Sequence, residues 1–119
     1  MQRFTDLKVW QQSHLMTLEV YRLTKAFPSE EKYGLVSQLR RAASSVPTNI
    51  AEGSKRRTGQ DYARFLNVAE GSLAETEYLL MLGSDLGYIK KERIKDLLDS
   101  IGGIARMLHA LRVKVEASA

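Results

Sequence analysis

The 119-residue chain contains no cysteine, which excludes disulfide bonds and thiolate metal sites. It has no apolar run near the roughly 20 residues that a membrane-spanning helix needs. Its first ten residues, MQRFTDLKVW, lack the apolar core of a signal peptide. These absences predict a soluble, cytoplasmic protein that does not contact membranes. The length predicts a single domain over residues 1–119.

Clusters of catalytic or metal-ligating residues are also missing. The two histidines, His14 and His109, are isolated, and neither follows a glutamate by the three residues typical of bundles that bind paired metals. No glycine-rich phosphate loop follows a strand, because no stretch has the period of a strand. We therefore predict no metal, no cofactor and no catalytic residue. An enzyme would need a ligand site hidden between glutamate-rich and arginine-rich helices.

Helical periodicity covers nearly the whole chain. Apolar residues recur every three or four positions in four segments, at about 5 or 6–26, 30–55, 58–86 and 90–115. Short breaks between long helices are typical of antiparallel neighbours. The predicted fold is therefore all-α, an antiparallel up-down-up-down four-helix bundle.

Individual residues suggest where these helices begin, bend and end. Ser29 is a good N-cap for the second helix. Pro47 lies inside that helix and should kink it, because proline removes one backbone hydrogen bond and crowds the carbonyl near Ala43. Thr58, with an acid three residues later, resembles a capping box, and Gly87 suits a left-handed C-cap.

The apolar stripes predict the core. The second helix has one narrow stripe (Leu35, Leu39, Ala42, Ala43, Val46, Ile50) and the fourth has a continuous one (Ile94, Leu97, Leu98, Ile101, Ile104, Leu108, Leu111, Val115). The first helix has two rows (Leu7, Trp10, Leu15, Leu18 and Val9, Met16, Val20, Leu23), as does the third (Tyr62, Leu66, Ala69, Leu73, Leu80 and Phe65, Val68, Leu79, Leu82, Leu86). Two rows are more than a lone bundle needs. We also expect Gly102 and Gly103 to permit a close helix approach.

Basic residues are concentrated in the middle of the chain. The 18 basic and 14 acidic residues give a net charge of +4. Residues 40–64 alone hold six basic and two acidic residues, which equals that excess. Lys55, Arg56 and Arg57 come at the end of the second helix, where cations also complement the helix dipole. This distribution permits nucleic-acid binding without requiring it.

Three acids of the third helix lie among apolar residues. Glu70 and Glu77 are seven residues apart and so share a face, and Glu75 lies between them. Buried carboxylates need partners, and Arg40 and Arg41 of the neighbouring helix are the expected ones. We favour a network that fixes helix register or a subunit contact over an acid/base pair.

One side of the second helix is polar and small. It comprises Ser37, Arg41, Ser44, Thr48 and Glu52. Small side chains allow close approach of another backbone, either of a second subunit or of a nucleic-acid strand. No aromatic residues interleave with the basic ones, which argues against a stacking platform for single strands.

Several stretches together resemble one protein family. The run "YGLVSQLRRAASSVPTNIAEG", with "FTDLKVW" before it and "FLNVAEGSLAETEYLLMLGSDLGY" after it, resembles the bacterial four-helix-bundle proteins named after intervening sequences of 23S rRNA. The motif residues are Tyr33, Gly34, Leu35, Gln38, Leu39, Arg40, Arg41, Pro47, Asn49, Glu52 and Gly53. Thr76 after Glu75 departs from the leucine expected there. The resemblance implies a homo-oligomer, typically a pentamer, without established catalytic residues. It also implies a fold similar to the accessory protein of diversity-generating retroelements, which binds nucleic acid and a reverse transcriptase.

Two functions remain in competition. The first is a non-enzymatic homo-oligomer that binds structured RNA, ribosomal RNA included, or DNA, through Arg40, Arg41, Lys55, Arg56 and Arg57. The second is a protein–protein scaffold, in which the arginines and the small polar face form a subunit interface. Its predicted interface or buried ion pairs comprise Arg40, Arg41, Asn49, Glu52, Glu70 and Glu77.

Overall fold

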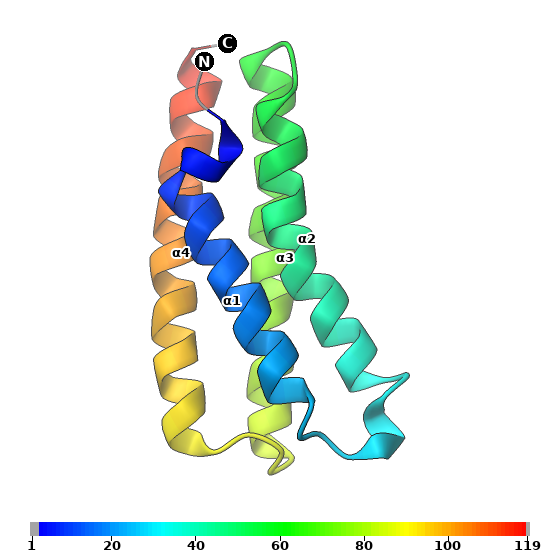
Figure 1. Cartoon of the computed structure of the whole chain (residues 1–119). Helices are drawn as coiled ribbons and strands as arrows, with labels where there is room; N and C mark the ends of the chain where they lie inside the picture. The colour runs from blue at the N-terminus through cyan, green and yellow to red at the C-terminus, as the bar shows by residue number, and fades with distance from the viewer. Residues whose placement is uncertain (1–2, 119) are drawn as a thin grey trace.

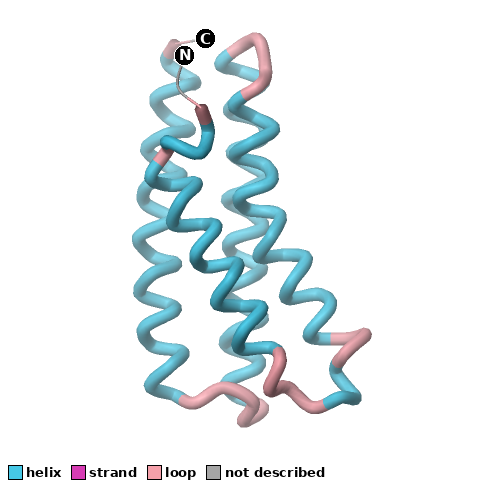
Figure 2. Tube along the Cα trace, in the orientation of Figure 1, coloured by secondary structure: helices cyan, strands magenta, loops and turns pink. Residues whose placement is uncertain are grey.

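The computed structural model describes residues 3–118, which form four α-helices joined by short connections (Figure 1, Figure 2). The helices are α1 (Lys8–Thr24), α2 (Leu35–Ser54), α3 (Gly59–Asp85) and α4 (Lys91–Ala117). Two short 3-10 turns, η1 (Phe4–Asp6) and η2 (Ser29–Glu31), precede α1 and α2. The predicted all-α four-helix fold is confirmed, and none of the described residues forms a strand. No helix in this part of the chain is long and apolar enough to cross a membrane.

Consecutive helices run antiparallel, so that η1 and the C-terminal end of α4 lie at the same end of the bundle as the α2–α3 loop (Figure 1). The bundle measures 45 × 25 × 20 Å. Helices α2 and α3 share the most extensive contact, and among the helices that touch, α1 and α4 share the least extensive one. The six predicted apolar positions of α2 are all buried, and they form one continuous core with side chains from the other three helices.

The helix ends are partly as predicted. The Thr58 hydroxyl accepts a hydrogen bond of 3.1 Å from the Asp61 backbone N–H, and Gly87 has a φ of +85°. The predicted start of the second helix is wrong, because α2 begins at Leu35 and Ser29 does not cap it. Gly34 lies just before α2 with φ −109° and ψ −106°, outside the helical region. Glycine is a poor helix former, so the turn before it stays separate.

Pro47 lies within α2, which continues through it to Ser54, while the kink stays a prediction. A proline has no N–H to donate to the carbonyl four residues earlier, which here belongs to Ala43. The hydroxyl of Thr17 on α1 shares its proton between the Ser13 carbonyl at 2.9 Å and this carbonyl at 3.2 Å. The α1–α2 contact thus supplies the donor that the proline lacks.

Some predicted core positions are at the surface instead. Leu15 and Leu18 of α1, and Val68 and Leu86 of α3, are exposed. On each of these two helices, one of the two apolar rows therefore extends beyond what the bundle buries.

The close approach predicted at Gly102 and Gly103 is also wrong, because a methyl group there would meet only the side chain of Arg106. The close approaches are at Gly53 and Gly83. A Cβ at Gly53 would lie 2.8 Å from that of Phe65, and one at Gly83 would lie 3.2 Å from the ring of Phe27.

Candidate nucleic-acid interface

The charge of the bundle is concentrated at one end. We call the half that contains residues 3–15, 45–72 and 105–118 the basic end; it includes η1, the C-terminal part of α4 and the α2–α3 loop (Figure 1). It holds nine basic and five acidic residues, a net of +4, whereas the other half holds nine of each. The folded chain therefore carries its whole excess charge at the basic end. The sequence analysis identified only the basic residues that are close together in sequence. The basic residues of α4 and of the N-terminal segment are distant in sequence, and the fold brings them to the same end of the bundle.

The α2–α3 loop presents three exposed cations, Lys55, Arg56 and Arg57. None of them has a carboxylate partner among the described residues. The loop backbone is held by bonds from the Lys55 and Arg56 N–H groups to the carbonyls of Glu52 and Gly53, at 3.2 and 3.0 Å. The Arg56 side chain also donates to the Glu52 carbonyl, at 3.2 Å. The loop thus presents three cations without carboxylate partners among the described residues, of which Arg56 is already held by the Glu52 carbonyl.

The aromatic ring nearest this loop is covered by arginines. The guanidinium carbons of Arg56 and Arg64 lie 4.9 and 5.0 Å from the ring centre of Phe65, within cation–π range. Arg64 is also paired with Asp61 at 2.7 Å. Tyr62 is half-buried, and burial raises the pKa of its hydroxyl. Phe65 is thus already in contact with two guanidinium groups, and Tyr62 is only partly accessible.

An open groove of about 800 Å³ runs beside the loop, between α3 and α4. Its lining includes the polar side chains Thr58, Gln60 and Asn67 and two ion pairs, Arg64 with Asp61 and Arg112 with Glu116. Such groups suit contacts with phosphate and sugar oxygens.

Arg40 and Arg41 lie in the other half of the bundle, away from the loop. Arg40 donates to the Thr24 hydroxyl at 2.8 Å and to the Tyr21 carbonyl at 3.3 Å, and its guanidinium lies 4.6 Å from the Tyr21 ring centre. Arg41 is exposed. These two arginines thus lie nearer the start of α2 than Lys55–Arg57 do, outside the basic end.

Within the bundle, the predicted pairing of Arg40 and Arg41 with the acids of the third helix is wrong, while the alternative of a subunit contact stays a prediction. Glu70 pairs instead with Arg112 of α4, which also pairs with Glu116 at 2.7 Å. These carboxylates raise the pKa of Arg112, Glu70 contributing most. Glu77 is exposed and has no ion-pair partner in the described chain.

Helix geometry explains the error. Ser72 faces α2, since its hydroxyl lies 2.9 Å from that of Ser45. Glu70 is two residues away, or about 200° around the helix, and so faces α4. Sequence reasoning did not identify Arg112, nor Arg93 of α4, which pairs with Glu19 of α1 and lowers its pKa.

The polar side of α2 is at the surface as predicted, since Ser37 and Ser44 are partly exposed and Arg41, Thr48 and Glu52 are fully so. Asn49 lies at its edge and bonds within the helix, to the carbonyl and hydroxyl of Ser45 at 2.8 and 3.0 Å. Because the Ser45 hydroxyl also contacts Ser72 of α3, the Asn49 amide lies next to the contact between α2 and α3.

The histidines make separate contacts. His14 stacks on Trp10 with ring centres 5.2 Å apart, and His109 lies 4.0 Å from Glu70. Across residues 3–118, no group of three or more candidate ligands could hold a metal ion.

Fold and surface define a four-helix bundle with one cationic end. The chain belongs to the 23S rRNA-intervening sequence protein family, whose pattern matches residues 5–110. The crystal structure of a protein of unknown function from the S23 ribosomal protein family of Bacteroides thetaiotaomicron VPI-5482 is similar, with a TM-score of 0.80 and 26% sequence identity. The match covers 87% of this chain and 94% of that one. No curated protein sequence matches the chain.

Proposed function

We propose that this protein is a non-enzymatic, homo-oligomeric RNA-binding bundle of the cytoplasm, which contacts structured RNA through its basic end. The observation that carries the proposal is that the whole net charge of +4 falls in this half of the bundle. Lys55, Arg56 and Arg57, which have no carboxylate partner among the described residues, lie in the α2–α3 loop of this half. The family's name links its members to 23S rRNA, so ribosomal RNA is the first ligand to test.

The chemistry of the basic end favours contacts with phosphates. Free lysine and arginine side chains neutralise phosphates and release counterions, which makes binding strongly salt-dependent. The ring of Phe65 is covered by Arg56 and Arg64, so stacking of unpaired bases is not expected. We therefore expect recognition of a folded, largely double-stranded RNA by its backbone.

Self-association would strengthen a weak single contact. Several copies that present the same loop to one RNA raise the effective concentration of each site for its phosphates. The family resemblance implies such an assembly.

The test compares affinities for a fluorescent 23S rRNA hairpin by anisotropy. Replacing Lys55, Arg56 and Arg57 together by alanine should weaken binding at least tenfold, since each lost phosphate contact reduces affinity. The matched control replaces Lys90, Lys91 and Lys95, three exposed cations of the opposite end, and should bind nearly as wild type. Equal losses in both variants would reduce the proposal to non-specific charge attraction, and binding of a DNA duplex with the same affinity would remove the preference for RNA.

A protein–protein scaffold is the second candidate. The exposed tyrosines Tyr33 and Tyr78 favour it, with 87% and 60% of their surface accessible, because tyrosine is enriched at interfaces. It predicts an assembled protein that binds no RNA even at low salt.

A further inference from the structure

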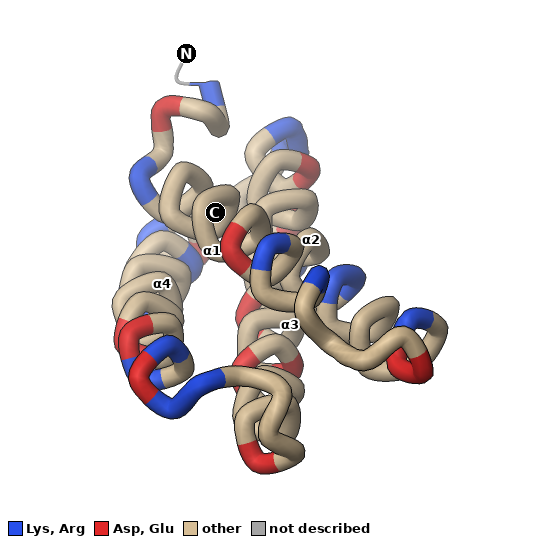
Figure 3. The backbone as a smooth tube through the Cα atoms, turned by 60° about the horizontal axis from the view of Figure 1, so that its bottom comes forward, with Lys and Arg blue, Asp and Glu red and all other residues tan. Residues whose placement is uncertain are grey.

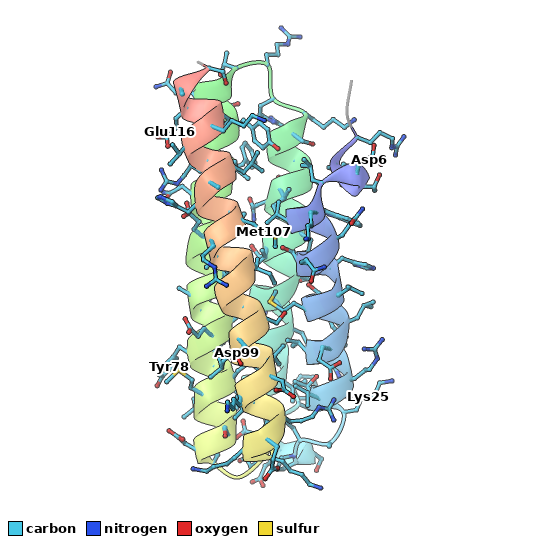
Figure 4. All side chains as sticks on the ribbon, turned by 90° about the vertical axis from the view of Figure 1, so that its left-hand side faces the viewer. Asp6, Lys25, Tyr78, Asp99, Met107 and Glu116 are labelled. Carbon is cyan, nitrogen blue, oxygen red and sulfur yellow. The ribbon has the colours of Figure 1, made fainter. Side chains whose placement is uncertain are left out.

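The outer face of α3 combines acidic and apolar side chains. Residues 65–89 contain no lysine, arginine or histidine. Tyr78, Met81 and Leu86 are exposed by 60%, 46% and 50%. Figure 4 shows Tyr78 pointing outward from the edge of the bundle. We call this surface the acidic face; it comprises Glu75, Glu77, Tyr78, Met81, Asp85 and Leu86.

The acids of this face are not used within the bundle. Glu75, Glu77 and Asp85 are exposed, and none of them forms an ion pair among the described residues. Glu75 makes only a long hydrogen bond of 3.5 Å with Gln38. By contrast, Glu70 earlier on the same helix is paired with Arg112.

A surface of opposite character lies along α1 and α2. It contains two exposed tyrosines and three cations, and we call it the cationic face: Tyr21, Lys32, Tyr33, Arg40 and Arg41. These residues line an open depression of about 400 Å³. Figure 3 shows the basic segments of α2 and the acidic segments of α3 on separate helices.

The cations of this face also have no carboxylate partner in residues 3–118. Arg40 is fixed by the Thr24 hydroxyl and the Tyr21 carbonyl and ring, so it is ordered before any partner binds. Tyrosine and arginine are the residue types that most often dominate binding energy at interfaces. Pre-ordered side chains also lose less entropy on binding.

The two faces do not satisfy one another within a single copy. No ion pair joins the two faces in the described chain, although α2 packs on α3 and Gln38 of α2 donates a 3.5 Å hydrogen bond to Glu75. The two faces are nevertheless complementary in charge. The acidic face presents carboxylates beside apolar side chains, and the cationic face presents cations beside aromatic rings. Complementary charges of this kind specify a partner and its orientation.

We propose that the acidic face of one copy docks on the cationic face of a second copy. The inference rests on the self-association in the proposed function, and it names the two surfaces. Because the surfaces differ, the contact is head-to-tail and closes into a ring when the rotation between copies permits. The α2–α3 loop belongs to neither face, so it remains free for RNA in the assembly.

Charge reversal tests the pairing by sedimentation velocity at micromolar concentration. Lys32→Glu with Arg41→Glu reverses the cationic face, and Glu75→Lys with Asp85→Lys reverses the acidic face. Each variant should sediment as a monomer, whereas one chain carrying all four changes should assemble like the wild type, and a mixture of the two reversed variants should form mixed species larger than the monomer. As a control, Lys90→Glu with Lys91→Glu changes the net charge by the same amount at a site outside both faces. It should leave assembly intact. All these side chains are exposed, and circular dichroism checks that each variant is folded.

A monomeric wild type, or reversed variants that still assemble, would overturn the inference. Failure of the proposed function looks different, because an assembled wild type would then bind no RNA. Dissociation by Thr48→Glu on the polar side of α2, with the reversed variants still assembled, would place the interface on that side instead.

Discussion

Thr17 should be essential to the stability of the bundle because it compensates for Pro47. The Thr17 side chain is buried and its hydroxyl contacts two carbonyl oxygens, of Ser13 at 2.9 Å and of Ala43 at 3.2 Å. Thr17→Val keeps the shape and removes the hydroxyl. The Ala43 carbonyl then stays buried without the donor that Pro47 lacks, which costs about 1–3 kcal/mol.

Thr48→Val is the matched control. The Thr48 hydroxyl also bonds a carbonyl four residues earlier, that of Ser44 at 2.8 Å, but this threonine is exposed. Water replaces the lost donor there, so the free energy of unfolding should change by less than about 0.5 kcal/mol.

A second substitution tests the cause. Pro47→Ala restores an N–H that can donate to the Ala43 carbonyl, so Thr17→Val should cost less in that background. The double-mutant cycle should give a coupling of about 1 kcal/mol. The assay is urea unfolding followed by circular dichroism, with the midpoint and slope fitted for all four proteins. An equal cost of Thr17→Val in both backgrounds would refute the role assigned to the proline.

Two further substitution pairs test the packing of α3. Gly53→Ala should destabilise the protein by about 1–3 kcal/mol, because its methyl group would overlap a Cβ of α3, while Gly71→Ala, in open space, should stabilise it by about 0.5–1 kcal/mol. Equal effects in urea unfolding would contradict the close approach. Glu70→Gln should lower the urea midpoint because it breaks the pair with α4, whereas Glu77→Gln should leave the midpoint unchanged. A similar shift for both would show that the ion pair adds nothing.

The fold could be predicted because the chain repeats its helical pattern consistently. The stripe from Leu35 to Ile50 identified a buried face through Pro47, and the caps at Thr58 and Gly87 placed two helix ends. The start of α2 was missed because Ser29 and the acids after it resemble a helix start, although Gly34 separates them from the helix.

The site was less predictable because its partners come from helices far apart in sequence. Lys55–Arg57 were identified as a cluster since they are adjacent. The pairing of Glu70 with Arg112 depends on which neighbour each side of α3 faces, and periodicity alone does not give the order of helices around a bundle. No sequence pattern identified Tyr33 and Tyr78 as surface residues, whereas the structure shows that both are exposed.

The salt dependence of RNA binding tests the central claim most directly. For the wild type, the logarithm of the association constant should fall steeply with the logarithm of salt concentration. Replacing Lys55, Arg56 and Arg57 by alanine should reduce that slope by about 2–3, close to one released counterion per lost phosphate contact. An unchanged slope and affinity, or no binding by the assembled wild type at low salt, would contradict the assignment of the basic end as the RNA-binding surface.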